Sequence, residues 1–480
     1  MPENANITAI YTEKSGNTTT GEENYSELTC QELYRGVRGA AIRILSRVDR
    51  SDSYLDKQLE YELTQGELTA VDKALLIEIT SGVMRWQAKL DWILTGFYHG
   101  EYIKCITPVR NAMRTALYQI LFIPKIPVQD ALQESLEIIH RIKGERSATI
   151  VAGVLKNILR HINDIRYPDS RENPVFYNSV VLSHPQWLVK RWTERFGQAE
   201  TEKLLAMNNQ RPRTTLRINS LKATHEQVIE WLNTNKIANA PVELLKDAHL
   251  HISSLAHITS SELFKNGWVT LEDASTALAL KLADIQPDMS VIDLCSSPGT
   301  RAFHLAEKVS DAGKITAIDK YESRLRIIEN EKKRLGISRL EMRLGDATKY
   351  GQEEKADIVI VGTPSSNLGQ LSRKPDIKWK REPEQLLHFA SIQKDILKNA
   401  AKLVKDGGIL LYTVRTFEPE ETTHIAEWFL KEHPDFTLDP AEKYLPEEMC
   451  KDGFMQLFPH IHNTDGAFAA RFLKIAKKSF

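Results

Sequence analysis

The stretch that decides the fold reads Asp293-Leu294-Cys295-Ser296-Ser297-Pro298-Gly299-Thr300-Arg301. An apolar strand over residues 289–294 leads into a turn of small residues, and a helix is predicted to begin at Thr300. Backbone N–H groups in such a turn can approach a ligand closely, and the start of a helix favours a carboxylate or phosphate group. The stretch therefore predicts a ligand-binding crossover in an α/β sheet.

Strands and helices continue to alternate on the C-terminal side of this crossover. Further strands are predicted over residues 314–318, 356–361 and 408–413, and helices over residues 300–309, 324–335, 391–404 and 420–430. This alternation predicts a doubly wound parallel sheet, a Rossmann-like α/β domain over residues 267–480.

Two acidic residues end predicted strands of this domain. Asp319 lies where a carboxylate can bind ribose hydroxyls, and Asp346 lies where an adenine amino group can be met. Each aspartate taken alone also fits a helix cap. The dinucleotide pattern G-x-G-x-x-G is absent, which argues against NAD. The crossover and both acids together favour a nucleotide-like ligand.

The N-terminal half has a different pattern. Residues 1–28 are polar and are predicted to form a disordered tail. Residues 30–165 carry apolar side chains at helical spacing, which predicts an all-α bundle with no acid, base or metal constellation of its own. The clearest apolar stripe consists of Leu75, Ile79, Val83, Trp86, Leu90 and Ile93.

A small mixed α/β module is predicted over residues 175–265. Arg211, Arg213 and Arg217 lie around its first strand and are candidates for an RNA-contacting edge. A solvated strand end is the alternative interpretation of the same cluster.

Composition limits the possible functions. The 480 residues include 63 Lys and Arg against 64 Asp and Glu, so any nucleic-acid contact must come from local patches. The four cysteines are scattered, which predicts reduced thiols in a cytoplasmic protein. No apolar run approaches ~18 residues. We expect a soluble monomer with no membrane partner and no bound metal.

Several short segments carry a family resemblance that extends over nearly the whole chain from about Arg35. They are residues 72–76, 82–86, 184–187, 216–219, 267–275, 375–379, 456–460 and 465–466. With the crossover, they resemble the Sun/Fmu (RsmB-like) family of ribosomal RNA cytosine-5 methyltransferases. The resemblance implies a NusB-like RNA-binding domain, a linker module and a class I methyltransferase domain that uses S-adenosylmethionine (SAM). It implies a cofactor site made of Cys295, Ser296, Ser297, Pro298, Gly299, Thr300, Arg301, Asp319, Arg324 and Asp346.

The family's covalent chemistry requires two cysteines. One thiolate adds to C6 of cytosine, the second assists elimination, and an aspartate holds the flipped base. In this chain Arg415 stands at the nucleophile position, Ser365 at the helper position and Gly362 at the base-holding position. A guanidinium is always protonated and has no lone pair for attack, so covalent C5 methylation is predicted to be lost.

A basic segment offers a second candidate RNA surface. Arg373, Lys374, Lys378, Trp379, Lys380 and Arg381 combine cations with an aromatic ring, which suits an RNA backbone and a stacked base. A solvated basic loop is the alternative.

Three functional hypotheses follow from these residues. The first is an RNA-binding homologue, acting on ribosomal RNA, that has lost covalent methylation. The second is an active SAM-dependent RNA methyltransferase that uses no cysteine. The third is a NusB-like antitermination module whose appended fold is only structural.

Overall fold

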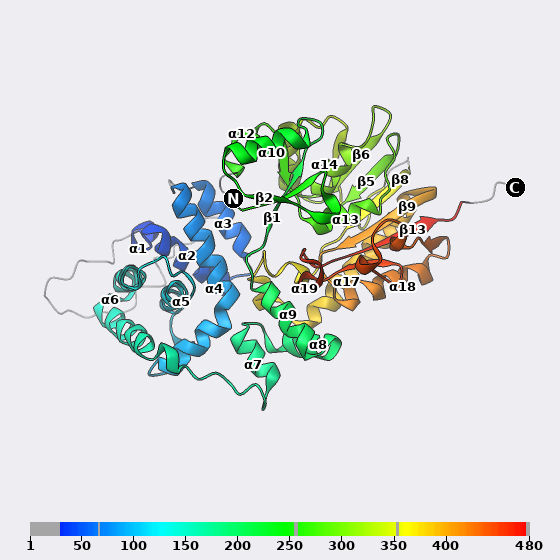
Figure 1. Cartoon of the computed structure of the whole chain (residues 1–480). Helices are drawn as coiled ribbons and strands as arrows, with labels where there is room; N and C mark the ends of the chain where they lie inside the picture. The colour runs from blue at the N-terminus through cyan, green and yellow to red at the C-terminus, as the bar shows by residue number, and fades with distance from the viewer. Residues whose placement is uncertain (1–28, 66–67, 254–257, 352–354, 477–480) are drawn as a thin grey trace. The chain divides into compact units, whose positions relative to one another are not determined.

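The computed structural model describes residues 29–65, 68–253, 258–351 and 355–476. The chain divides into two compact units, Met1–Arg195 and Phe196–Phe480 (Figure 1). Among the described residues, no helix is both long and apolar enough to cross a membrane.

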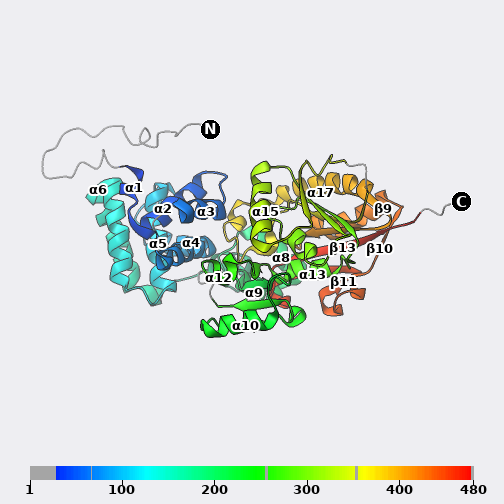
Figure 2. The same ribbon diagram turned by 90° about the horizontal axis from the view of Figure 1, so that it is seen from above.

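The described part of the N-terminal unit is helical, as predicted. Its helices are α1 (Cys30–Leu33), α2 (Gly36–Arg50), α3 (Leu55–Gln65), α4 (Ala70–Phe97), α5 (Thr107–Phe122), α6 (Val128–Arg160), α7 (Pro174–Val181) and α8 (Gln186–Phe196). Helices α2, α4, α5 and α6 pack against one another (Figures 1 and 2).

The apolar stripe of α4 faces the core of this unit. Ile79, Val83, Leu90 and Ile93 are all buried, because their spacing places them on one side of the helix. Helix α7, which the sequence assigned to the second module, packs instead on α4, where Trp92 meets Phe176 edge to face with ring centroids 5.7 Å apart.

The C-terminal unit begins with α9 (Gln198–Asn208) and a small antiparallel sheet of order β2-β3-β1-β4. Its elements are β1 (Thr214–Ile218), α10 (His225–Thr234), β2 (Asn239–Pro241), β3 (His249–Ile252), α12 (Glu262–Lys265) and β4 (Val269–Leu271). The predicted boundary at residue 267 is wrong in detail, because β4 pairs with β1 through Leu216 and Leu271 and so completes the small sheet.

The larger sheet contains the predicted Rossmann-like core. Its strands are β5 (Ser290–Leu294), β6 (Lys314–Asp319), β7 (Leu340–Leu344), β8 (Ala356–Gly362), β9 (Val404–Val414), β10 (Phe436–Leu438), β11 (Cys450–Lys451), β12 (Phe454–Leu457) and β13 (Ala467–Lys474). The order is β11-β12-β13-β9-β8-β5-β6-β7, with β10 paired to β13. Strands β5 to β9 are parallel, and the strand order reverses between β5 and β8, where open α/β sheets bind ligands.

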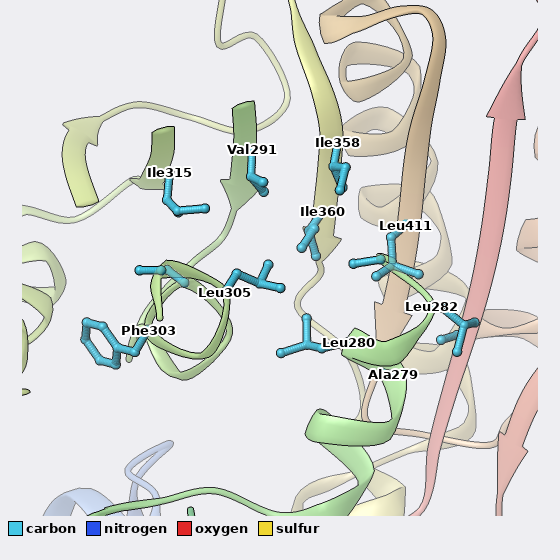
Figure 3. Close-up of a cluster of buried hydrophobic side chains, with 14 of the residues drawn as sticks. Ala279, Leu280, Leu282, Val291, Phe303, Leu305, Ile315, Ile358, Ile360 and Leu411 are labelled. Atoms are coloured by element: carbon cyan, nitrogen blue, oxygen red, sulfur yellow. The ribbon is translucent and has the colours of Figure 1, made fainter. Parts of the chain in front are cut away.

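Helices cover both faces of this sheet. They are α13 (Ala274–Lys281), α14 (Thr300–Ala306), α15 (Glu322–Leu335), α17 (Pro383–Leu403) and α18 (Thr423–Glu432). Two single-turn helices, α16 (Ile377–Lys380) and α19 (Pro459–His462), lie in the connecting segments. Side chains of α13, α14 and α15 pack on one face, and those of α17 and α18 on the other. Figure 3 shows the first core, where Leu280 and Leu305 reach toward strand residues such as Ile360. This packing fixes the position of the loops at the carboxyl ends of β5 to β9.

Candidate functional site

The loops at these carboxyl ends form what we call the strand-end site, residues 295–301, 319–324, 345–348, 362–367 and 415–421. In the first loop the Ser296 hydroxyl donates to Asp293 Oδ2 at 2.6 Å. Gly299 N–H donates to the Ser296 carbonyl at 2.8 Å and closes the turn. Gly299 has a φ of 101°, and a Cβ there would lie 2.5 Å from the Phe303 ring, so the turn requires glycine.

Arg301 turns back over this loop. Its Nε donates to Asp293 Oδ1 at 2.9 Å, and Nη2 donates to the Cys295 carbonyl at 2.8 Å. The guanidinium also covers Gly362 at the end of β8, where an added Cβ would lie 2.2 Å from Arg301 Cζ. The charge of Arg301 is therefore already paired, and its side chain fills the space that any larger residue at position 362 would enter.

Asp319 lies beside the first loop, as the sequence predicts for a ribose-binding carboxylate. It is 4% exposed. Its Oδ2 accepts from the Ser297 N–H at 3.3 Å, and its Oδ1 accepts from the Tyr321 N–H at 3.2 Å. Arg324 Nη1 is 3.8 Å from Oδ1. Each carboxylate oxygen accepts more than one hydrogen bond, so Asp319 retains acceptor capacity for hydroxyls.

Asp346 also lies at this edge of the sheet, but its carboxylate has local partners. Its Oδ1 accepts from the Thr348 N–H at 3.0 Å and from the Thr348 hydroxyl at 2.8 Å. Lys320 Nζ lies 3.0 Å from Oδ2. The Thr348 hydrogen bonds and then Lys320 lower the pKa of Asp346 to about 2. These contacts favour a role for Asp346 in capping its own turn over a role in binding adenine.

The two loops that hold the covalent machinery in the family lie next to each other. Strands β8 and β9 pair through Gly362 and Thr413, and the Ser366 hydroxyl donates to Thr416 Oγ1 at 3.2 Å. The Ser365 hydroxyl donates to Asn367 Oδ1, an amide oxygen, at 3.4 Å. Ser365 thus has the geometry of a turn residue.

Arg415 follows β9 directly. Its Nη2 donates to Thr276 Oγ1 at 3.4 Å. Burial lowers the pKa of its guanidinium, Asp465 and Asp273 oppose that shift, and Arg301 and Arg373 add to it. A guanidinium whose ordinary pKa exceeds 12 remains protonated at neutral pH. The nucleophile position therefore carries a cation.

Neither thiol of the C-terminal unit is activated. Burial raises the pKa of Cys295 to about 12 and that of Cys450 to about 11. A nucleophilic cysteine needs the opposite shift. Cys450 lies in β11, at the edge of the sheet, away from β8 and β9 in the strand order.

The structure separates the predicted RNA-binding residues into two groups. Arg217 and Lys378 are 2% and 1% exposed, and Arg381 is also buried. Arg217 pairs with Glu272 and Glu307, Lys378 Nζ donates to Asn209 Oδ1 at 3.2 Å, and Arg381 Nε donates to the Ser366 carbonyl at 2.9 Å. Arg373 pairs with Asp273 and Asp465. Because these four cations are used internally, they are corrected to structural residues. Arg211 and Arg213 are exposed, and Lys374, Trp379 and Lys380 are half-exposed.

Glu421 is a site residue that sequence reasoning did not single out. It is fully buried, and its Oε2 accepts from the Ser366 N–H at 2.9 Å and from Gln393 Nε2 at 3.0 Å. Burial raises its pKa to about 7. Its partners are distant in sequence, so only the fold reveals that Glu421 joins the β8 and β9 loops.

This pKa predicts a pH-dependent stability. The folded protein holds the Glu421 proton more tightly than the unfolded chain, whose ordinary value is 4.5. The stabilising contribution of Glu421 to the free energy of unfolding is therefore fully present below about pH 4.5. About 3 kcal/mol of it is lost as the pH rises toward 7. We expect Glu421→Gln to remove this slope in urea unfolding measured from pH 4.5 to 8. The exposed control Glu427→Gln should keep it, and an equal slope in both variants would contradict the assignment.

Comparison with known protein families identifies each part of the chain. The family "16S rRNA methyltransferase RsmB/F" matches residues 278–473, the NusB family matches residues 35–160, and an RsmF/B-like ferredoxin-like domain matches residues 184–254.

Individual relatives match over most of their length. A probable ribosomal RNA small subunit methyltransferase B of Bacillus subtilis is 32% identical over 440 residues, covering 90% of this chain and 97% of the relative. A ribosomal RNA small subunit methyltransferase B of Serratia proteamaculans is 28% identical, covering 86% and 92%.

Solved structures agree with this assignment. The crystal structure titled PH0851 has a TM-score of 0.76 at 25% identity, covering 91% of this chain and 98% of that one. NSun6 from Pyrococcus horikoshii shares the fold alone, with a TM-score of 0.56 at 18% identity, covering 61% and 99%. The chain therefore belongs to the Sun/Fmu (RsmB/F) family of SAM-dependent ribosomal RNA methyltransferases.

Proposed function

We propose that this chain is a cytoplasmic RNA-binding member of its family, acting on ribosomal RNA, in which covalent cytosine C5 methylation has been lost. The observation that carries the proposal is the position of Arg415 directly after β9, where the family places its nucleophile, because a guanidinium has no lone pair for attack. Gly362 and Ser365 on the neighbouring loop supply no carboxylate and no thiol. The remaining thiols of the unit have raised pKa values, which supports the absence of a replacement nucleophile.

RNA contact is assigned to the cations that the fold leaves accessible. Arg211, Arg213, Lys374 and Lys380 can neutralise phosphates, and Trp379 can stack on a base. Because the whole chain is nearly neutral, this local set must supply the salt-dependent part of the affinity.

The cofactor loop still fits SAM in part. The tight turn at Gly299 and the acceptor capacity of Asp319 suit the polar ends of such a ligand. Backbone groups of residues 295–299 and the Asp319 carboxylate would hold it, and when bound it supplies a methyl group. The engaged charges of Arg301 and Asp346 reduce the number of groups left to hold it.

The retained loop favours a second candidate, an active methyltransferase that uses no cysteine. Attack by an exocyclic amine or a ribose hydroxyl needs no thiol, and the remaining acceptor capacity of the Asp319 carboxylate supports this candidate.

The two candidates differ in SAM binding and methyl transfer. We expect salt-dependent binding of ribosomal RNA, no 5-methylcytosine after incubation with tritiated SAM and RNA from a strain lacking the protein, and no cytosine adduct by mass spectrometry. Isothermal titration that shows no heat at millimolar SAM would exclude the active enzyme. Methyl transfer to an amine or hydroxyl would establish it, and a cytosine adduct on any side chain would refute the loss of covalent chemistry.

A further inference from the structure

Three residues distant in sequence lie close together inside the C-terminal unit, outside the residues of the strand-end site. His249 lies in β3, Glu272 directly follows the last residue of β4, and His304 lies in α14. One ligand atom of each lies within 4.8 Å of the others, and all three residues are buried. We call this group the His249–Glu272–His304 cluster. It joins the small sheet to the helix that follows the cofactor loop.

The distances between the side chains of the cluster can be compared with those around a bound metal ion. His304 Nδ1 lies 2.9 Å from Glu272 Oε1, and His249 Nε2 lies 3.7 Å from Glu272 Oε2. The two imidazole centroids are 6.0 Å apart. In a tetrahedral zinc site with bonds of about 2.0–2.1 Å, neighbouring ligand atoms are separated by roughly 3.4 Å. The two measured separations lie on either side of that value, but they involve different oxygens of the Glu272 carboxylate, and the shorter one is a hydrogen bond that a bound ion would replace.

The cluster contains polar atoms that lack hydrogen-bond partners. Neither ring nitrogen of His249 makes a hydrogen bond, although the residue is 0% exposed. Arg217 Nη2 is in the same condition, whereas Arg217 Nε and Nη1 form ion pairs with Glu272 Oε2 and Glu307 Oε1. Buried polar groups are almost always satisfied, so the two unpartnered nitrogens of His249 point to an occupant that completes the site.

The charges indicate which occupant would be favoured. Arg217 forms ion pairs with both Glu272 and Glu307, so one guanidinium faces two carboxylates. Lys308 also interacts electrostatically with both carboxylates, so with neutral imidazoles the group is close to neutral and has no excess positive charge that would repel a metal ion. Arg217 holds one oxygen of Glu272, in the manner of the outer partners that orient metal-binding carboxylates.

We propose that His249, Glu272 and His304 bind a divalent transition-metal ion, with Zn²⁺ as the ion that best fits two imidazoles and one carboxylate. The sequence predicted no metal site, because the three ligands are spread over 56 residues and form no short motif. The burial of the ligands closes the site to RNA, so the ion stabilises the joint between the small sheet and α14. A water molecule would supply the fourth ligand.

The test uses the full chain after treatment with a chelator. We expect one Zn²⁺ per chain by isothermal titration and a visible absorption band when Co²⁺ replaces it. At an ion concentration about 100-fold above Kd, the Tm of the C-terminal unit should rise by about 5–10 °C.

Variants locate the ion. His249→Gln keeps a side chain of similar size, and Glu272→Gln removes only the charge; each should weaken binding at least ~100-fold and abolish the Tm rise. His388→Gln, at an exposed histidine of α17, is the matched control and should bind as the parent does. The proposal would be overturned if the parent protein gave no heat of binding on titration with Zn²⁺ and no visible absorption band with Co²⁺, which would leave water as the occupant. Unchanged binding by a folded His249→Gln or Glu272→Gln variant would do the same. None of these readouts depends on RNA or methyl transfer, so they are independent of the proposed function.

Discussion

Cytosine methylation is expected to return when Gly362→Asp, Ser365→Cys and Arg415→Cys are combined with Arg301→Lys, and to remain low when Arg301 is kept. The reason is the contact between Arg301 and Gly362. A Cβ at position 362 would lie 2.2 Å from both Cζ and Nη1 of Arg301. The guanidinium cannot move without breaking its hydrogen bonds to Asp293 and Cys295. An aspartate at position 362 therefore displaces the Arg301 guanidinium and costs these two hydrogen bonds.

Lysine removes this obstacle because its ammonium is a compact point charge on a flexible stem, whereas the guanidinium is a planar fork. It is also the residue that the family resemblance places at position 301. Since loss of a nucleophile costs up to ~10⁶-fold in kcat, the quadruple variant should exceed the parent by at least ~10³-fold in tritiated methyl incorporation. We expect the triple variant to be at least ~10²-fold slower than the quadruple variant.

A matched control isolates the thiol. The same quadruple variant with Arg415→Ser in place of Arg415→Cys has the same steric changes but no thiolate, and it should remain inactive. Equal activity of the triple and quadruple variants would show that the Arg301 side chain moves away from position 362 at little cost. An inactive quadruple variant would mean that another residue also blocks the reaction, such as Thr300 in the cofactor loop, where the family resemblance places a glycine.

The positions of most parallel strands along the chain could be predicted because the information is local, whereas their order in the sheet was not predicted. Each buried strand is a continuous apolar run followed by small or acidic residues, as in residues 289–301. The prediction therefore placed the first loop, Asp319, Gly362 and Arg415 at strand ends, and the structure has them there. The antiparallel strands β10 to β13 were not predicted, because they are short and their pairing depends on distant partners.

The interaction partners of the charged side chains could not be predicted in the same way. Lys378 and Arg217 look like solvated cations in the sequence, yet their partners Asn209, Glu272 and Glu307 are far away along the chain. Pairing of this kind is decided by the tertiary structure. The same is true of the contact between Arg301 and Gly362, which no spacing rule contains.

Arg373→Leu is expected to destabilise the C-terminal unit strongly rather than to weaken RNA binding selectively. Arg373 Nε donates to Asp465 Oδ1 at 2.8 Å, and its Nη2 donates to Asp273 Oδ2 at 2.6 Å. Both aspartates are nearly buried, and Asp273 also caps α13 through the Ser275 N–H at 2.9 Å. Burial and the neighbouring Asp273 already raise the pKa of Asp465. Without the guanidinium, two adjacent carboxylates would face each other.

Breaking a buried ion pair costs about 3–5 kcal/mol, and the partial exposure of Arg373 places its loss at about 3 kcal/mol. Urea unfolding should therefore show a lower midpoint with an unchanged m value. The loss of unfolding free energy should be smaller in the double variant Arg373→Leu with Asp465→Asn. The amide removes the repulsion between the carboxylates of Asp465 and Asp273 that Arg373 otherwise offsets.

Arg213→Leu is the matched comparison, since Arg213 is exposed and its backbone carbonyl accepts from the same Arg373. Its stability should change by no more than about 0.5 kcal/mol. Its affinity for RNA should fall, and the salt dependence should lose about one phosphate contact. If Arg373→Leu instead kept full stability and lost the same RNA contact, Arg373 would belong to the RNA surface. We expect the opposite outcome, because Nε and Nη2 of Arg373 donate to two buried carboxylates that no other described guanidinium pairs with.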